Sequence, residues 1–141
     1  GKPEHIQKII DEGPDIISHN IETVRRLTPL IRTKAKYDRS LEVVRYISGS
    51  GTTAKSGFMV GLGEQDREVF ETMEDIRKTG CRILTVGQYL RPGLQHMGVA
   101  EYITPEKFIE YRKFALSLGF DHVECDPLVR SSFHSEKQIS V

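Results

Sequence analysis

The stretch Lys55-Ser-Gly-Phe-Met-Val-Gly-Leu-Gly-Glu64 passes from an apolar strand, through Gly-Leu-Gly, to an acidic residue at the start of a helix. Two later stretches, Thr85-Val-Gly-Gln-Tyr-Leu-Arg-Pro92 and Pro127-Leu-Val-Arg-Ser-Ser-Phe-His134, also end an apolar run in glycines or polar groups. A parallel α/β sheet presents a ligand site at the carboxyl ends of its strands. Together the three stretches predict such a sheet, with a site along one edge.

Apolar runs alternate with amphipathic helices along the chain, which is typical of βα units. We expect strands at 15–20, 55–63, 81–90 and 121–125, and helices at 4–12, 22–32, 38–48, 64–79 and 105–118. Pro29 should kink the second helix or restart it at Thr28, and Thr104 should cap the last one. Three core strands plus one extra make about half of an eight-stranded barrel, so the chain is interpreted as a piece of a larger enzyme.

Length and charge narrow the possible functions. The chain has 141 residues, which fits a single domain, and its 20 basic and 20 acidic residues balance. This balance argues against nucleic acid or an anionic membrane as a partner. Without a signal peptide or an apolar stretch of about 20 residues, a cytoplasmic protein is expected. Cys81 and Cys125 are 44 residues apart, which fits no CxxC spacing, so both are interpreted as core residues.

The turn after the second expected strand is a candidate binding element. Gly61, Gly63 and Glu64 lie where a strand passes into a helix. Glycines there let the backbone approach a ligand, and the helix N-terminus offers free N–H groups. A tight βα turn without a ligand explains Gly-x-Gly equally well, and the third glycine of a dinucleotide fingerprint is absent.

Polar side chains follow the neighbouring strands. Gln88, Tyr89 and Arg91 could hold a purine edge, a ribose and a carboxylate, or could be merely a polar strand end. Asn20 reaches the same rim from the first strand, beside His19. A lone histidine is more often structural than functional, so we do not choose His19.

The tail carries one further candidate, the segment from Arg130 to His134. Arg130 could supply charge to an anion or a metal cluster, and a hydroxyl of Ser131 or Ser132 could supply a ligand. The alternative is a solvated tail, because the residues from Ser131 onward are polar and show no period. We therefore expect no strand after residue 125.

Several motifs in one order resemble the lipoyl synthases, a family of radical S-adenosylmethionine (SAM) enzymes. The resemblance is carried by the three stretches quoted above together with Ile17-Ser-His-Asn-Ile-Glu-Thr-Val24, Tyr37-Asp-Arg-Ser-Leu41 and Tyr102-Ile-Thr-Pro-Glu106. It implies the C-terminal half of a partial (βα)6 radical SAM TIM-type barrel. It also implies two [4Fe-4S] clusters and SAM in the intact enzyme, which inserts two sulfur atoms at C6 and C8 of an octanoyl group, with the auxiliary cluster as sulfur donor.

The resemblance also implies residue roles. Ser131, or less favourably Ser132, would ligate the auxiliary cluster beside Arg130, and Arg91 would face the SAM carboxylate or the substrate. The residues implied around SAM are Asn20, Gly61, Gly63, Glu64, Gln88 and Tyr89. The expected division is a half-barrel at 1–128 and a tail at 129–141. Where the family usually has Tyr after the serine pair, this chain has Phe133, which has no hydroxyl.

The main departure from the family is in the cysteines. Lipoyl synthases carry C-x3-C-x2-C and C-x4-C-x5-C motifs upstream of this region, and this chain has only two cysteines. We expect the chain alone to be inactive, with a missing N-terminal half as one partner. The other partner would be an octanoylated lipoyl carrier domain, such as glycine cleavage H protein or 2-oxoacid dehydrogenase E2. Alternatives are a fragment of another radical SAM or TIM-barrel enzyme, or a non-catalytic carrier-binding module.

Overall fold

A computed structural model of the chain describes residues 3–32, 36–129 and 138–141. Its elements, in chain order, are α1 (Pro3–Asp11), β1 (Ile16–Ser18), the 3-10 turn η1 (Arg25–Leu27), α2 (Thr28–Ile31), α3 (Tyr37–Gly49), β2 (Thr53–Val60), α4 (Asp66–Lys78), β3 (Ile83–Gln88), α5 (Pro105–Ser117), β4 (His122–Cys125) and β5 (Gln138–Ser140). Strands and helices alternate as the sequence predicts, and the expected α/β class is confirmed.

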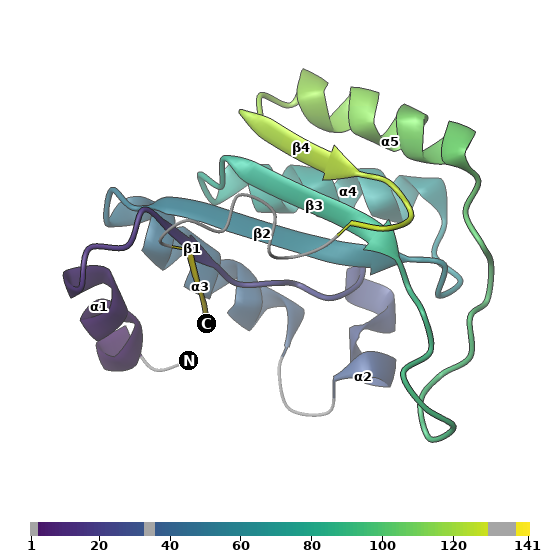
Figure 1. Ribbon diagram of the computed structural model, residues 1–141, viewed down its shortest axis with the longest axis horizontal. Coiled ribbons are helices and arrows are strands. Elements are labelled where there is room, and N and C mark those ends of the chain that lie inside the picture. Colours follow the sequence, from purple (N-terminus) through teal and green to yellow (C-terminus); the bar gives the residue numbers. More distant parts are fainter. Residues whose placement is uncertain (1–2, 33–35, 130–137) are drawn as a thin grey trace.

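The strands form one parallel sheet in the order β4-β3-β2-β1-β5 (Figure 1). The four strands from β1 to β4 lie next to their neighbours in sequence, as in part of a TIM-type barrel. β5 was not expected, and it pairs with the free edge of β1. The sheet therefore has five strands, where the sequence predicts four.

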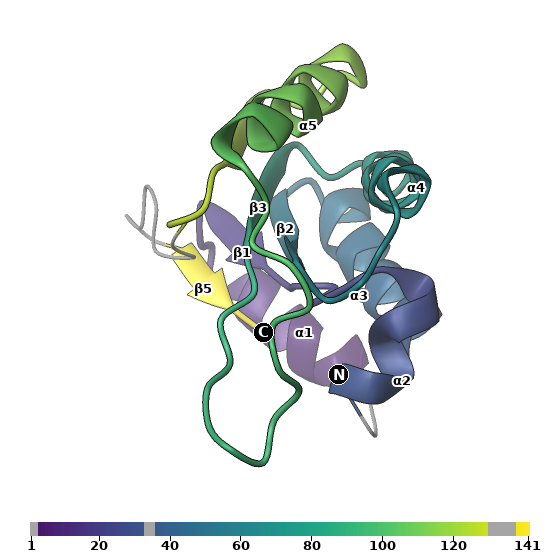
Figure 2. The same cartoon turned by 90° about the vertical axis from the view of Figure 1, so that its right-hand side faces the viewer.

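Helices cover one face of the sheet. Figure 2 shows α3 and α4 together on one side of β2 and β3. Alternate strand residues point into this layer, and they meet the apolar stripes of the helices. The buried residues of this core include Ile17, Ala54, Leu84 and Val86 from strands, and Val44, Ile47, Val69, Met73, Ile76 and Ala115 from helices. Burial of these side chains is the main stabilising contribution.

Two helices begin at other residues than the sequence predicts. The helix expected over 22–32 is replaced by η1 and α2, because Glu22 adopts φ 80° and pairs with Phe58 as an isolated bridge. The restart at Thr28, ahead of Pro29, is confirmed. The helix expected from Glu64 begins at Asp66 instead.

Candidate functional site

A cavity of about 180 Å³ lies at the carboxyl ends of β1, β2 and β3. This is the edge toward which the strand arrows point in Figure 1. The cavity is lined by Asn20, Glu22, Gly57, Phe58, Met59, Thr85, Gly87, Gln88 and Val129. Two of the predicted binding residues, Asn20 and Gln88, therefore lie together at this cavity.

Glu22 is a lining residue that the sequence analysis missed. Its backbone is held in the left-handed region because its carbonyl accepts a hydrogen bond from the Met59 amide at 2.8 Å, while its own amide donates to the Gly57 carbonyl at 3.4 Å. Its carboxylate lies 3.9 Å from the Arg32 guanidinium. The sequence offered no local signal for this placement, because Glu22 is positioned by residues of β2, which are distant in sequence.

Two of the residues that line the cavity are glycines packed closely against their neighbours. A Cβ on Gly57 would overlap Oγ1 of Thr85, the neighbouring residue on β3. A Cβ on Gly87 would lie 3.4 Å from the Val129 side chain, which lines the same cavity. A larger residue at Gly57 would displace Thr85, so the absence of a side chain there preserves the wall that Thr85 forms.

The Glu64 side chain stabilises the turn after β2, to which it belongs. The Glu64 carboxylate accepts hydrogen bonds from the amides of Gly61, at 2.9 Å, and Leu62, at 3.0 Å. Gly61 and Gly63 have φ values of 101° and 106°, which L side chains rarely adopt. The predicted binding residues Gly61, Gly63 and Glu64 thus form a self-bonded turn beside the cavity, and none of the three lines it.

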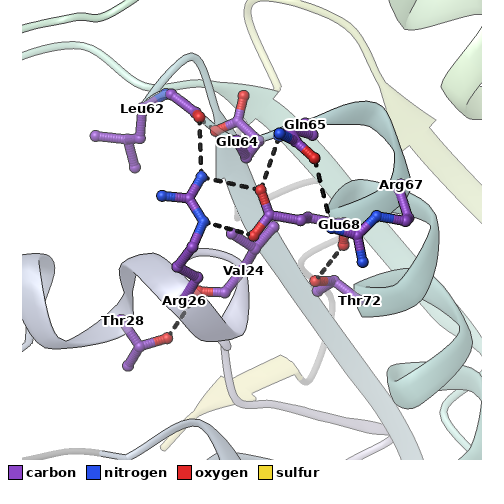
Figure 3. Close-up of polar contacts among 10 residues, drawn as sticks. Val24, Arg26, Thr28, Leu62, Glu64, Gln65, Arg67, Glu68 and Thr72 are labelled. Carbon is purple, nitrogen blue, oxygen red and sulfur yellow. Dashed lines mark hydrogen bonds and ion pairs between the residues drawn. The ribbon is translucent and has the colours of Figure 1, made fainter.

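An arginine from η1 joins this turn to the segment that follows β1 (Figure 3). The Arg26 guanidinium donates to both Glu68 carboxylate oxygens, at 2.9 and 3.0 Å, and to the Gly63 carbonyl at 3.1 Å. Glu68 in turn accepts from the Gln65 amide at the start of α4. The Arg26 hydrogen bond lowers the pKa of Glu68 below its ordinary value. Two of the loops at the carboxyl edge are thereby fixed to each other.

Gln88 closes the loop between β3 and α5. Its Nε2 donates to the carbonyls of Tyr89 and Glu101, and its Oε1 accepts from the Ile103 amide at 2.9 Å. All polar atoms of this side chain therefore have backbone partners, although Gln88 lines the cavity. A ligand that used this amide would have to share these bonds.

Tyr89 and Arg91 also bond within that loop. Tyr89 is 4% exposed, and its hydroxyl donates to the Met97 carbonyl at 2.7 Å. The Arg91 guanidinium donates to the carbonyls of Gly93 and His96, each at 3.0 Å, and also to that of Leu94. Their polar groups shape the loop in this structure, and contact with a ligand stays a prediction for both.

A larger hollow of about 300 Å³ lies outside the strand ends, between α2 and the start of α3. Its walls include Arg25, Arg32 and Tyr37. Arg25 is paired with Asp38 at 2.8 Å and lies over the Tyr37 ring at 4.4 Å. Because every lining residue comes from the segment between η1 and α3, this hollow lacks the convergence of several strand ends that marks a ligand site.

Residues 1–76 match the radical SAM superfamily. The chain belongs to this superfamily. Over 139 residues it is 58% identical to a lipoyl synthase of Phocaeicola vulgatus, with 99% of this chain and 49% of that protein covered. Lipoyl synthases of Bacteroides thetaiotaomicron and Treponema denticola are 54% and 50% identical over 139 residues, with 99% of this chain and 49% and 48% of those proteins covered. This radical SAM chain spans about half the length of the curated relatives it matches.

The cysteines of this radical SAM chain do not fit an iron–sulfur cluster. Burial raises the pKa of both Cys81 and Cys125 to about 12, so both thiols are neutral near pH 7. Their sulfur atoms contact backbone carbonyls in the core. Within 3–32, 36–129 and 138–141, no group of three or more His, Cys, Asp or Glu side chains could hold a metal ion.

The tail candidates Arg130, Ser131, Ser132, Phe133 and His134 lie outside the described residues. Their role as an auxiliary-cluster segment stays a prediction, as does the boundary at residue 128. Among the helices that the structure describes, none has both the length and the apolar character needed to span a bilayer.

Proposed function

We propose that this chain is the C-terminal half of a lipoyl synthase, a radical SAM sulfurtransferase that inserts sulfur at C6 and C8 of an octanoyl group. The observation that carries the proposal is the identity of 50–58% to lipoyl synthases along almost the whole chain. The acceptor would be an octanoylated lipoyl carrier domain, such as the H protein of glycine cleavage or a 2-oxoacid dehydrogenase E2. The chain alone would be inactive, because its two cysteines are core residues.

The cavity at the carboxyl edge fits part of SAM. Asn20, Glu22 and Thr85 bring an amide, a carboxylate and a hydroxyl to its walls, and a carboxylate there can accept hydrogen bonds from ribose hydroxyls. Gly57 and Gly87 line the cavity without a side chain, and an adenine ring would pack against the strands there. At about 180 Å³ the cavity is smaller than the roughly 300–1,000 Å³ of ordinary ligand pockets, so the upstream half would supply the remaining walls.

The remaining predicted residues would act around this cavity. Gly61, Gly63 and Glu64 would fix the turn beside the ligand, and Gln88 would offer its amide at the adenine side. Tyr89 would hold the loop that closes over the ligand, and Arg91 would lie toward the SAM carboxylate or the substrate. When bound to a reduced cluster, SAM supplies the radical that removes hydrogen from unreactive carbons.

For the tail, we propose that Ser131 ligates the auxiliary cluster and that Arg130 steadies it by its charge. Ser132 is the alternative ligand. A hard serine oxygen among soft thiolates would be the weakest link to iron, which suits a cluster that must give up sulfide.

The test joins this chain to the upstream half of the Phocaeicola vulgatus lipoyl synthase and reconstitutes the product anaerobically with iron and sulfide. About eight irons per polypeptide and conversion of an octanoylated carrier to its lipoyl form would support the proposal. About four irons would indicate a single-cluster radical enzyme, and no iron would indicate a carrier-binding module. Either result, or an unchanged carrier, contradicts it.

Two pairs of variants examine the sites in the joined protein. Glu22→Gln should weaken SAM binding roughly tenfold or more, because it removes a charge-assisted acceptor, whereas Glu74→Gln on the exposed face of α4 should leave binding unchanged. Ser131→Ala should abolish sulfur transfer, and Ser131→Cys should slow sulfur release. Turnover of Ser131→Ala at the parent rate would rule out the ligand assignment.

A further inference from the structure

The C-terminal strand β5 occupies the outer edge of β1. Ile16, Ile17 and Ser18 pair in parallel register with Gln138, Ile139 and Ser140. Side chains reinforce the pairing, because the Ser18 and Ser140 hydroxyls lie 2.9 Å apart and His19 Nδ1 lies 2.8 Å from the Val141 carbonyl oxygen. Figure 2 shows β5 beside β1, away from the helical layer of α3 and α4.

This pairing is held mainly by hydrogen bonds, among them Val141 N–H to the Ser18 carbonyl at 2.8 Å and Lys55 Nζ to Gln138 Oε1 at 3.5 Å, and it buries little apolar surface. β5 has three residues, all intermediate or exposed, and two of them are the polar residues Gln138 and Ser140. By contrast, β2 and β3 share six register pairs and bury Phe58 and Val86 among them. Since buried apolar area is what stabilises strand packing, β5 is the weakest attachment in the sheet.

The topology assigns the β1 edge to a different strand. From β4 to β1 each strand lies beside its sequence neighbour, and helices connect them. Parallel βα units continue in the same direction, so a strand that precedes β1 in sequence would pair with its free edge. β5 lies at this position, although it comes last in the chain.

We propose that β5 is an exchangeable strand, which leaves the β1 edge when a parallel strand of the upstream half pairs there. The inference rests on the proposed function, in which this chain is one half of a longer enzyme, as the 49% coverage of the relatives supports. The docking surface is the backbone of Ile16–Ser18, and its occupant is a parallel β-strand. An open edge of this kind invites such pairing.

An engineered disulfide between β1 and β5 would report whether β5 is paired with the free edge of β1. Ser18→Cys with Ser140→Cys places two thiols where the hydroxyls now lie 2.9 Å apart. Under mild oxidation the 141-residue chain should form this crosslink. In the chain joined to the Phocaeicola upstream half, its yield should fall at least tenfold. Ser18→Cys with Ser50→Cys is the matched control. It should form no crosslink in either protein, because Ser50 follows α3 ahead of the start of β2, whereas Ser18 pairs with Lys55 further along that strand.

Peptide mapping of the crosslink gives a clear outcome either way. Equal yields in the two proteins would show that β5 keeps the edge, and no crosslink in the 141-residue chain would show that it is not there; both results overturn the proposal. Hydrogen exchange of the unmodified proteins is a second readout, in which the 138–141 amides should be protected in the chain alone and should exchange at least tenfold faster in the joined protein. The 16–18 amides should stay protected in both.

The readouts need neither iron nor turnover. A joined protein that released β5 but transferred no sulfur would contradict the proposed function and leave the strand exchange intact. An active joined protein that kept the crosslink would support the proposed function and contradict the strand exchange.

Discussion

Alanine substitutions can separate backbone strain from steric overlap in the turn after β2, which borders the candidate site. Gly61 and Gly63 belong to this turn, and Gly49 serves as a control outside it. Gly49 ends α3, and a Cβ there would meet no atom within 4 Å. Gly63 has φ 106° but open space, since the nearest neighbour of an added Cβ would be 3.9 Å away. Gly61 has φ 101°, and a Cβ there would overlap Gln88 and lie 2.5 Å from the Glu101 carbonyl oxygen. Alanine at Gly49 therefore meets neither backbone strain nor steric overlap. At Gly63 it meets backbone strain alone, and at Gly61 it meets both.

The magnitudes follow from these contacts. Gly63→Ala should destabilise by about 1–3 kcal/mol, because the side chain is forced into an unfavourable φ. Gly61→Ala adds an overpacking cost of about 1–3 kcal/mol, for a total of about 2–6 kcal/mol. Gly49→Ala should be neutral or stabilise by up to about 1 kcal/mol, because alanine restricts the unfolded chain and favours helix.

Urea unfolding of the 141-residue chain, followed by far-UV circular dichroism, measures all three differences. The slope of free energy against urea should match the parent, so that midpoints report stability. If Gly61→Ala cost no more than Gly63→Ala, the close approach of Gln88 and the Glu101 carbonyl to this turn would be refuted. Destabilisation by Gly49→Ala of more than about 1 kcal/mol would refute the helical reasoning for the control.

Three further expectations concern polar and titrating groups. Gln88→Leu leaves three backbone groups of its loop unpaired, and should cost about 1–3 kcal/mol in the same urea assay. The pKa of Asp66 is lowered, chiefly by its hydrogen bond from Lys107. Its contribution to stability is therefore present above the unfolded pKa of about 3.9 and is lost as pH falls through the lower folded pKa. Asp66→Asn should make the free energy of unfolding fall less steeply with decreasing pH in this range, and an unchanged pH dependence would contradict this. Cys81 and Cys125, with pKa values raised by burial to about 12, should resist iodoacetamide at about pH 8 until the chain unfolds, as followed by mass spectrometry.

Local signals predicted the regular elements well. Thr104 caps α5 by accepting a hydrogen bond from the Lys107 amide, and α2 restarts at Thr28 as Pro29 requires. Both depend on a few adjacent residues, so the sequence contains the needed information. The apolar periodicity of α3 and α4 likewise matched the buried faces of these helices.

The candidate site was predicted in part. Asn20 and Gln88 were expected at the strand ends, and both line the cavity there. Glu22 was missed because its left-handed backbone is imposed by hydrogen bonds to β2, which is distant in sequence. Tyr89 and Arg91 were placed on the correct loop, but their bonds to carbonyls of that same loop depend on how it folds back.

Residue patterns alone were enough to establish the βα alternation, the parallel sheet and the edge where polar groups gather, because these follow from periodicity and from residues within one turn or strand. Three features emerged only from the folded arrangement: Glu64 bonds its own turn, Glu22 faces the cavity and β5 lies on β1. The positions of Glu22 and β5 depend on which backbone donors and acceptors are left free after distant segments meet, and the Glu64 contacts depend on how the chain turns back on itself after β2. A polar side chain or a short strand can satisfy several such groups, and the chain order alone does not choose among them.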